Sequence, residues 1–216
     1  MIKENLKKRT ITSVILIFLL YFTLKFNNIL IITLTLIGVL SILEFFNLSK
    51  KIFKNNILLL CFNILISLYV FIFCCLFIYI SNIIQLKLLL FLLLFGCIAS
   101  DIGGYVFGNL FKGPKLTKIS PNKTYFGAVG SLIFTILIFY CFFYLSNYYL
   151  SAKIIILAII TSLACQIGDL FVSLLKRKAN SKDTGNLLPG HGGVLDRLDG
   201  IFLGIPIGFI VIILIY

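Results

Sequence analysis

One stretch of this chain, residues 169–200, gathers most of its chemically active side chains. Four of the seven acidic residues lie there, with the only histidine and five of the nineteen basic residues. Apolar sequence flanks the stretch on both sides. This composition suits chemistry on phosphates, because carboxylates hold a divalent cation while lysines and arginines hold phosphates. The residues are Asp169, Asp183, Asp196, Asp199, His191, Lys176, Arg177, Lys178, Lys182 and Arg197.

The spacing of the polar residues predicts two polar helix faces. Asp196 and Asp199 are three residues apart, so on a helix they lie on one face. A second polar stripe recurs at the helical period within an apolar segment, and such a stripe points at protein or at a wet cavity rather than at lipid. Residues 189–193 contain three glycines, which leave the backbone free to wrap closely around a ligand. The second stripe consists of Ser162, Gln166, Asp169, Ser173 and Lys176.

A second polar segment, residues 100–127, contains an aspartate well inside an apolar run. Such a residue, Asp101, costs on the order of 3 kcal/mol at the centre of a membrane span. Asp169 carries a similar penalty, so each aspartate predicts a partner: the other aspartate, a cation, water, or a hydrogen bond between helices. Three glycines follow at helical spacing and would let another helix approach closely. They are Gly103, Gly104 and Gly108.

The composition of the chain predicts a polytopic membrane protein. Of its 216 residues, 61% are hydrophobic and 12% charged, and apolar runs of membrane-spanning length recur along it. In lipid these runs must be helices, because no water is present to bond the backbone. The predicted fold is therefore all-α, a single membrane-embedded helical bundle over residues 1–216, with residues 1–100 as scaffold and 101–200 carrying the site. The seven predicted spans are 10–26, 28–47, 55–79, 84–110, 126–146, 152–175 and 199–216.

The basic residues alternate between the two ends of these spans. Sixteen of the nineteen fall on one side and three on the other. The positive-inside rule then predicts a multi-pass protein of the inner (plasma) membrane, with its N-terminus and the 169–200 stretch cytoplasmic. The net charge of +12 is accounted for by topology and anionic headgroups, so nucleic acid is not predicted as a partner. Glu44, near the cytoplasmic end of the second span, is interpreted as a snorkelling or paired structural residue.

The pattern within 169–200 resembles the signature of the phosphatidate cytidylyltransferases (CDP-diacylglycerol synthases). A match of about a dozen positions over 27 residues is highly specific. A second segment, residues 115–124, resembles the family's other conserved stretch, except that Phe126 stands where the family has glutamate. The first hundred residues match only in being hydrophobic. The signature positions are Ser173, Lys176, Arg177, Lys182, Asp183, Gly185, Pro189, His191, Gly192, Gly193, Asp196, Arg197 and Asp199.

The resemblance implies that CTP and phosphatidate react to give CDP-diacylglycerol and pyrophosphate, with Mg²⁺ as cofactor. Mg²⁺ ligands would be Asp169 and Asp196, with Asp199 or Asp101 assisting. Phosphate binding would fall to Lys176, Arg177 and Arg197 for the triphosphate, and to Ser120 and Lys123 for the phosphatidate headgroup or the pyrophosphate. Closure over the nucleotide would involve Lys182, Asp183 and the 189–193 loop with Gly192 and Gly193, and His191 would either donate to a phosphate or pin this loop. Ser173 would also bind substrate.

Other readings stay open at this point. A CTP-dependent polyprenol or phytol kinase uses related chemistry, and Phe126 is compatible with an inactive family member. A transporter with aspartate-lined helices fits less well, because its site would lie near the membrane midplane. The CDP-alcohol phosphotransferase motif is absent, since no acidic residue follows Asp199. A homodimer and a second cation, monovalent or divalent, are compatible with the sequence, and membrane lipids are expected neighbours.

Overall fold

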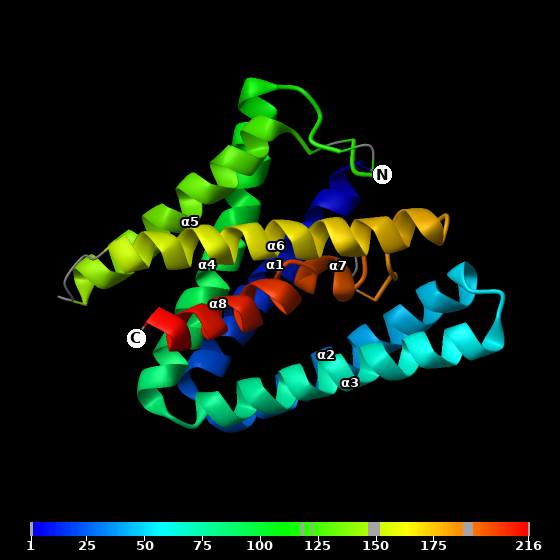
Figure 1. The fold of residues 1–216 in the computed structure, drawn as a ribbon, viewed down its shortest axis with the longest axis horizontal. Helices are drawn as coiled ribbons and strands as arrows, with labels where there is room; N and C mark the ends of the chain where they lie inside the picture. The colour runs from blue at the N-terminus through cyan, green and yellow to red at the C-terminus, as the bar shows by residue number, and fades with distance from the viewer. Residues whose placement is uncertain (1, 118, 122, 147–151, 188–191, 216) are drawn as a thin grey trace. The chain divides into compact units, whose positions relative to one another are not determined.

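The computed structural model describes residues 2–117, 119–121, 123–146, 152–187 and 192–215, with side chains from residue 10 onward. Within these residues, every secondary-structure element longer than one residue is an α-helix (Figure 1). The all-α prediction is therefore confirmed. The helices are α1 (Ile2–Lys25), α2 (Asn27–Ile52), α3 (Asn56–Ser81), α4 (Ile84–Phe111), α5 (Tyr125–Leu145), α6 (Ala152–Lys178), α7 (Leu195–Leu198) and α8 (Ile201–Ile215).

Six candidate membrane spans are found in the described part of the chain. They are long and apolar enough to cross a membrane, and a shorter apolar helix, Thr10–Lys25, lies where the first span is predicted. Each of the seven predicted spans therefore coincides with an apolar helix. The six candidates are Asn27–Ile52, Asn56–Ser81, Ile84–Phe111, Tyr125–Leu145, Ala152–Lys178 and Leu195–Ile215.

The chain divides into two compact units that do not follow the predicted boundary at residue 100. The first unit comprises Met1–Ile84 and Leu175–Leu198, and the second comprises Gln85–Leu174 and Asp199–Tyr216. The residues of the 169–200 stretch are thus shared between the two units. That the whole chain forms a single domain stays a prediction.

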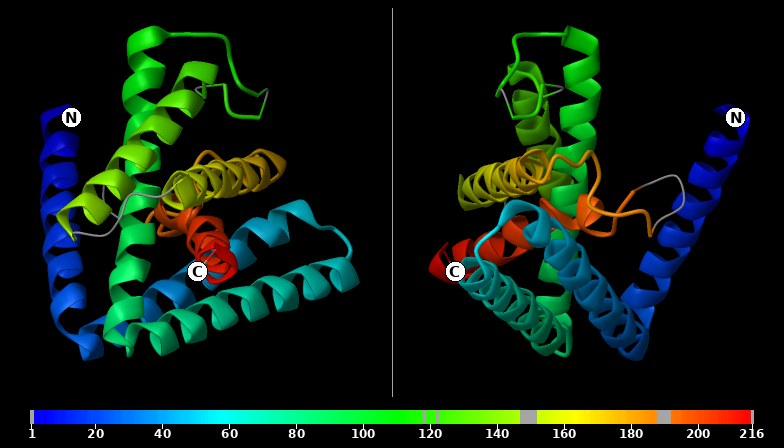
Figure 2. Two further views of the ribbon diagram at one scale, coloured as in Figure 1. Left: turned by 60° about the vertical axis from the view of Figure 1, so that its left-hand side comes forward. Right: turned by 90° about the vertical axis from the view of Figure 1, so that its right-hand side faces the viewer.

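In the first unit, α2 and α3 form a helical hairpin, seen in Figures 1 and 2. Gly38 brings the helices close, because a Cβ atom there would lie 2.8 Å from the Sγ atom of Cys74. Ser49 donates to the Asn63 side chain over 2.6 Å. The connection between the helices ends at Asn55, whose side chain caps α3 by accepting from the Ile57 N–H. The hairpin supports the end of α2 that carries Glu44.

In the second unit, α4 and α5 approach each other (Figure 2). Small residues lie at their contact. A Cβ atom at Gly103 would overlap the backbone oxygen of Gly130, and one at Gly104 would lie 2.7 Å from the Ser131 Oγ. The predicted close approach of another helix at these glycines is confirmed, and that helix is α5. The approach lets the Ser131 hydroxyl donate to the Ser100 carbonyl oxygen over 2.7 Å.

The polar stripe of α6 faces protein in the same unit, as predicted. Ser162 is fully buried, and its hydroxyl lies 3.0 Å from the Ser100 hydroxyl of α4. The Gln166 amide donates to the Ala128 carbonyl of α5. α6 also contacts the turn before α8, where Gly168 lies against the Asp199 carbonyl. These contacts place Asp169, the next residue of α6, on a helix that is fixed on several sides.

Candidate active site

The first unit holds the carboxylate of Asp196 between a lysine and three protein donors. Lys176 Nζ lies 2.7 Å from Oδ1 of Asp196. The other oxygen, Oδ2, accepts from the Thr184 N–H at 2.9 Å, the Thr184 hydroxyl at 3.0 Å and the Gly193 N–H at 3.1 Å. Both oxygens are therefore bound, and the Asp196 side chain is only 9% exposed. Such a carboxylate has a fixed orientation.

The end of α6 explains how Lys176 comes to face Asp196. After Lys178 the chain reverses through Asn180, which adopts a positive φ of 51°. Asparagine tolerates this left-handed conformation better than most residues, and it commonly follows a helix end. The Ser181 N–H then donates to the Lys176 carbonyl oxygen over 2.9 Å. The reversal carries Thr184 back toward the last turn of the helix, where Asp196 accepts from it.

A buried glutamate supports this arrangement from α2. Glu44 is 2% exposed, and its carboxylate accepts from the Thr184 hydroxyl and from the backbone N–H groups of Val194 and Leu195. The prediction that Glu44 is paired is confirmed. The alternative, a side chain that extends to the surface, is not observed. Its partners lie far away in the sequence and were not predicted. The one available signal was an acidic residue inside an apolar run, which indicates a specific partner.

The second unit holds a group of three aspartates. Asp169 forms an ion pair with Lys123 and accepts from the Ser173 hydroxyl over 3.4 Å. Asp199, 9% exposed, faces the carboxylates of Asp169 and Asp101. One of its oxygens also accepts from the Gly200 N–H at 2.9 Å. Asp169 and Ser173 share one face of α6, as predicted. Of the partners predicted for Asp169, the structure has a cation, Lys123, and two carboxylates.

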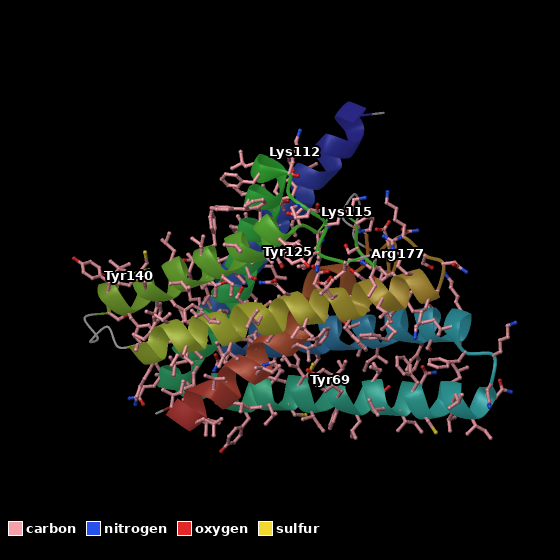
Figure 3. The ribbon with its side chains drawn as sticks, turned by 45° about the horizontal axis from the view of Figure 1, so that its top comes forward. Tyr69, Lys112, Lys115, Tyr125, Tyr140 and Arg177 are labelled. Atoms are coloured by element: carbon pink, nitrogen blue, oxygen red, sulfur yellow. The ribbon has the colours of Figure 1, made fainter. Side chains whose placement is uncertain are left out.

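Lys123 is positioned by the connection between α4 and α5. Lys115 and Thr124 form an isolated antiparallel bridge, and the Leu116 N–H donates to the Lys123 carbonyl. The Lys123 N–H in turn donates to the Ser120 carbonyl at 3.1 Å, which brings the two predicted binding residues together. Thr124 then caps α5 by accepting from the Gly127 N–H. Figure 3 labels Lys112 and Lys115 in this connection and Tyr125 where α5 begins.

Phe126, the departure from the family pattern, has a structural role here. Its ring centroid lies 5.6 Å from that of Phe111, and a Cβ atom at Gly113 would overlap the ring. Phe126 thus packs the start of the α4–α5 connection against the start of α5. The substitution places an apolar contact where a carboxylate is usual, at the side of the segment that carries Lys123.

One prediction of local structure is wrong. Asp196 and Asp199 were expected on one face of a helix, but α7 ends at Leu198 and Asp199 lies in a turn before α8. Asp196 belongs to the first unit and Asp199 to the second. The physical reason is that Gly200 follows Asp199 and donates its N–H to the Asp199 carboxylate. A glycine and a local bond of this kind favour a turn over a continued helix.

The remaining predicted residues are more open. Arg177, labelled in Figure 3, is exposed, as are Arg197, Lys182 and Asp183. Gly192 has a positive φ of 87°, and a Cβ atom there would lie 3.1 Å from Asp196 Oδ2, so this position requires glycine. His191 lies outside the described residues, as does most of the predicted 189–193 loop. The closure of these residues over a nucleotide stays a prediction.

The donor chemistry of the aspartates fits Mg²⁺. Every donor is a carboxylate oxygen, which is the ligand type that Mg²⁺ prefers, and Asp199 is buried against two like charges that a cation would neutralise. Among the described residues, no three His, Cys, Asp or Glu side chains form a ready-made metal site. Asp169 and Asp196 instead form ion pairs with lysines.

Comparison with known proteins finds one family. The model of the cytidylyltransferase family matches residues 5–215. A phosphatidate cytidylyltransferase of Rickettsia typhi is 35% identical over 221 residues, covering 96% of this chain and 92% of the relative. One of Rickettsia bellii is 44% identical over 130 residues, which is 56% of each protein. One of Mycobacterium leprae is 42% identical over 120 residues, 51% of this chain and 36% of the relative. The matched part of the chain thus spans about half the length of the Rickettsia bellii protein.

Proposed function

Because the chain belongs to the cytidylyltransferase family, we propose that it transfers the cytidylyl group of CTP to phosphatidate, forming CDP-diacylglycerol and pyrophosphate. The observation that carries the proposal is the pairing of an aspartate with a lysine in each unit, Lys176 with Asp196 and Lys123 with Asp169. These are the residue types that two phosphorylated substrates and a divalent cation need. The names of the relatives do not favour the prenol kinase alternative.

The reaction needs charge neutralisation more than proton transfer. A phosphate oxygen of phosphatidate forms a bond to the α-phosphorus of CTP, and the bond from that phosphorus to the oxygen bridging to the β-phosphate breaks. Pyrophosphate leaves with that oxygen. The nucleophile is already an anion, so it needs relief from repulsion and alignment rather than a general base. Lys176, Arg177 and Arg197 supply positive charge for the triphosphate, and Lys123 with Ser120 holds the phosphatidate headgroup or the pyrophosphate.

Mg²⁺ is the cofactor that the carboxylates suit. Asp169, Asp196 and Asp199 are the carboxylates proposed to bind it, with Asp101 assisting directly or through water. When bound, the ion would neutralise phosphate charge as it does in other phosphoryl transfers. Two of the proposed ligands, Asp169 and Asp196, are already paired with lysines. Lys123 and Lys176 would therefore have to move to phosphate oxygens before these two carboxylates could hold the cation.

The exchange of partners accounts for the presence of the lysines. A bare cluster of carboxylates would be destabilised by repulsion in the absence of substrate, and each lysine offsets part of this. A lysine can then reach a phosphate without a large movement, because its side chain is long and its charge is compact. The remaining signature residues, Ser173, Lys182, Asp183, His191, Gly192 and Gly193, are proposed to line or close the nucleotide site.

The proposed location follows from the charge asymmetry. Sixteen basic residues lie on one predicted side of the membrane against three on the other, which supports a cytoplasmic site and a cytoplasmic N-terminus in the inner membrane. CTP is then available from the cytoplasm, and phosphatidate from the leaflet that faces it.

The purified full chain in lipid nanodiscs tests the proposed function. With phosphatidate and CTP labelled at the α-phosphate or, in parallel, at the γ-phosphate, we expect the α-label in CDP-diacylglycerol and an equal amount of the γ-label in pyrophosphate, both dependent on added Mg²⁺ and abolished by EDTA. Diacylglycerol and undecaprenol replace phosphatidate in parallel reactions. A labelled product from either alcohol, or none from phosphatidate, would contradict the assignment.

A further inference from the structure

The buried carboxylate of Glu44 is not used by the chemistry described above, yet it touches the segment that holds Asp196. Its Oε1 accepts from the Val194 N–H at 2.9 Å. Its Oε2 accepts from the Leu195 N–H at 2.9 Å and from the Thr184 hydroxyl at 2.7 Å. These bonds join α2 to residues 140 to 151 positions later in the chain. All of these residues belong to the first unit.

Two glycines pack directly against the Glu44 carboxylate. A Cβ atom at Gly185 would lie 2.6 Å from Oε1, and one at Gly193 would lie 2.8 Å from the same oxygen. Any side chain at either position would push the segment off the carboxylate. The backbone at both glycines is therefore seated on Glu44, and Gly193 is also a donor to Asp196.

Thr184 links the two carboxylates. Its hydroxyl lies 2.7 Å from Glu44 Oε2 and 3.0 Å from Asp196 Oδ2, so the two carboxylates share its single hydrogen. The residue is 6% exposed. Its backbone N–H also donates to Asp196 Oδ2. Two of the groups that orient Asp196, Thr184 and Gly193, are thus both held by Glu44.

We propose that Glu44 is a positioning residue for cytidylyl transfer, which sets the orientation of the Asp196 carboxylate through Thr184 and the backbone of residues 193–195. The inference rests on the proposed function, in which Asp196 is a reacting-site carboxylate. A fold-stabilising role alone does not call for a carboxylate here, because a buried charge is costly and an apolar residue of similar size often stabilises as well. A carboxylate is the side chain that can accept from three donors at once.

The substitution Glu44→Gln, made in the full chain in nanodiscs, tests the proposal. Glutamine keeps the size of glutamate but sets an N–H₂ group against one of the three donors. We expect kcat and kcat/KM for CTP to fall together by about 10- to 100-fold, the range seen when a partner of a site ligand is lost. Backbone amide exchange at residues 193–195 should become faster. Ser41→Ala is the matched control, because Ser41 is equally buried in α2 but donates only to its own helix at Ile37.

If Glu44→Gln does not fold, two variants of Thr184 test the proposal instead. Thr184→Ser keeps the linking hydroxyl and should retain activity close to that of the wild type. In Thr184→Val, kcat should fall by about 10-fold or more. The double variant Glu44→Gln/Thr184→Val should be no worse than Glu44→Gln alone, because both act through one path.

Two results would overturn the inference. One is a kcat for Glu44→Gln equal to that of Ser41→Ala, and the other is equal activity in Thr184→Val and Thr184→Ser. If the wild type forms no CDP-diacylglycerol, the proposed function fails by itself. Amide exchange then still decides the role of Glu44: faster exchange at residues 193–195 in Glu44→Gln than in Ser41→Ala supports positioning, and equal exchange rejects it.

Discussion

The two units each present an aspartate paired with a lysine, but they hold it in different ways. In the first unit, Asp196 has both oxygens bound by Lys176 and by three donors from Thr184 and Gly193. In the second, Asp169 pairs with Lys123 and has one longer bond from Ser173, and it also faces a second carboxylate, Asp199. The first pair is 15% and 9% exposed and the second 24% and 28%.

This difference shows what each unit contributes. The donors around Asp196 come from backbone that folds back after α6, so they fix one orientation of one carboxylate. The surroundings of Asp169 come from α4, α6, the α4–α5 connection and the turn before α8, and they include two further carboxylates. An arrangement of like charges is stabilised by an added cation, whereas a carboxylate with four protein partners has to give up one of them, here Lys176, before it can bind one. We therefore expect the two aspartates to respond differently to the same substitution.

The largest expected effects come from Asp169→Asn and Asp196→Asn. Each should lower kcat by at least about 100-fold, because a charge that acts on the reacting phosphates is removed. Thermal unfolding separates them. Asp196→Asn turns an N–H₂ group toward N–H donors and should destabilise the protein by about 1–3 kcal/mol. Asp169→Asn relieves repulsion from Asp199, so its melting temperature should equal or exceed that of the wild type.

Lys54→Gln is the control for both, because Lys54 is exposed in the connection between α2 and α3 and belongs to neither lysine pair. Full activity in Asp196→Asn would remove Asp196 from the reacting site. Equal loss of melting temperature in the two variants would mean that the units hold their aspartates alike, which contradicts the contrast drawn above.

The two lysines should separate the two substrates. Lys176→Gln is expected to raise KM for CTP, and Lys123→Gln to raise KM for phosphatidate, each by about 10-fold, since one charge-assisted hydrogen bond is worth about 1.4 kcal/mol or more. Steady-state kinetics with each substrate varied in turn measures this. Lys50→Gln, at an exposed position near the end of α2, should change neither constant. An increase in the same KM from both lysine variants would show that the pairs serve one substrate.

The smallest expected difference concerns packing. Gly103→Ala should destabilise the second unit by about 1–3 kcal/mol, because the added methyl group meets the Gly130 backbone, which cannot move aside. Gly38→Ala in the first unit should cost less stability, since the added methyl group meets the Cys74 side chain, which can rotate. Chemical denaturation of the two variants in the same detergent compares them. A larger loss of unfolding free energy in Gly38→Ala than in Gly103→Ala would contradict this expectation.

The sequence alone determined the helices and the chemistry. Apolar runs that enter lipid must become helices, because no other structure satisfies their backbone groups. For that reason each of the seven predicted spans coincides with an apolar helix. The glycines of α4 and the polar stripe of α6 contact other helices, as predicted. The signature within residues 169–200 led to the family directly, since it depends only on residue types at fixed spacing.

Only the tertiary structure decided which groups bond to which. Helix periodicity placed Asp196 and Asp199 on one face, but the helix ends at Leu198 and the two residues belong to different units. Glu44 finds its partners 140 or more residues away, and spacing did not show which lysine each aspartate would pair with. A carboxylate pairs with whatever donors the folded backbone brings within about 3 Å, and local sequence carries no record of that distance.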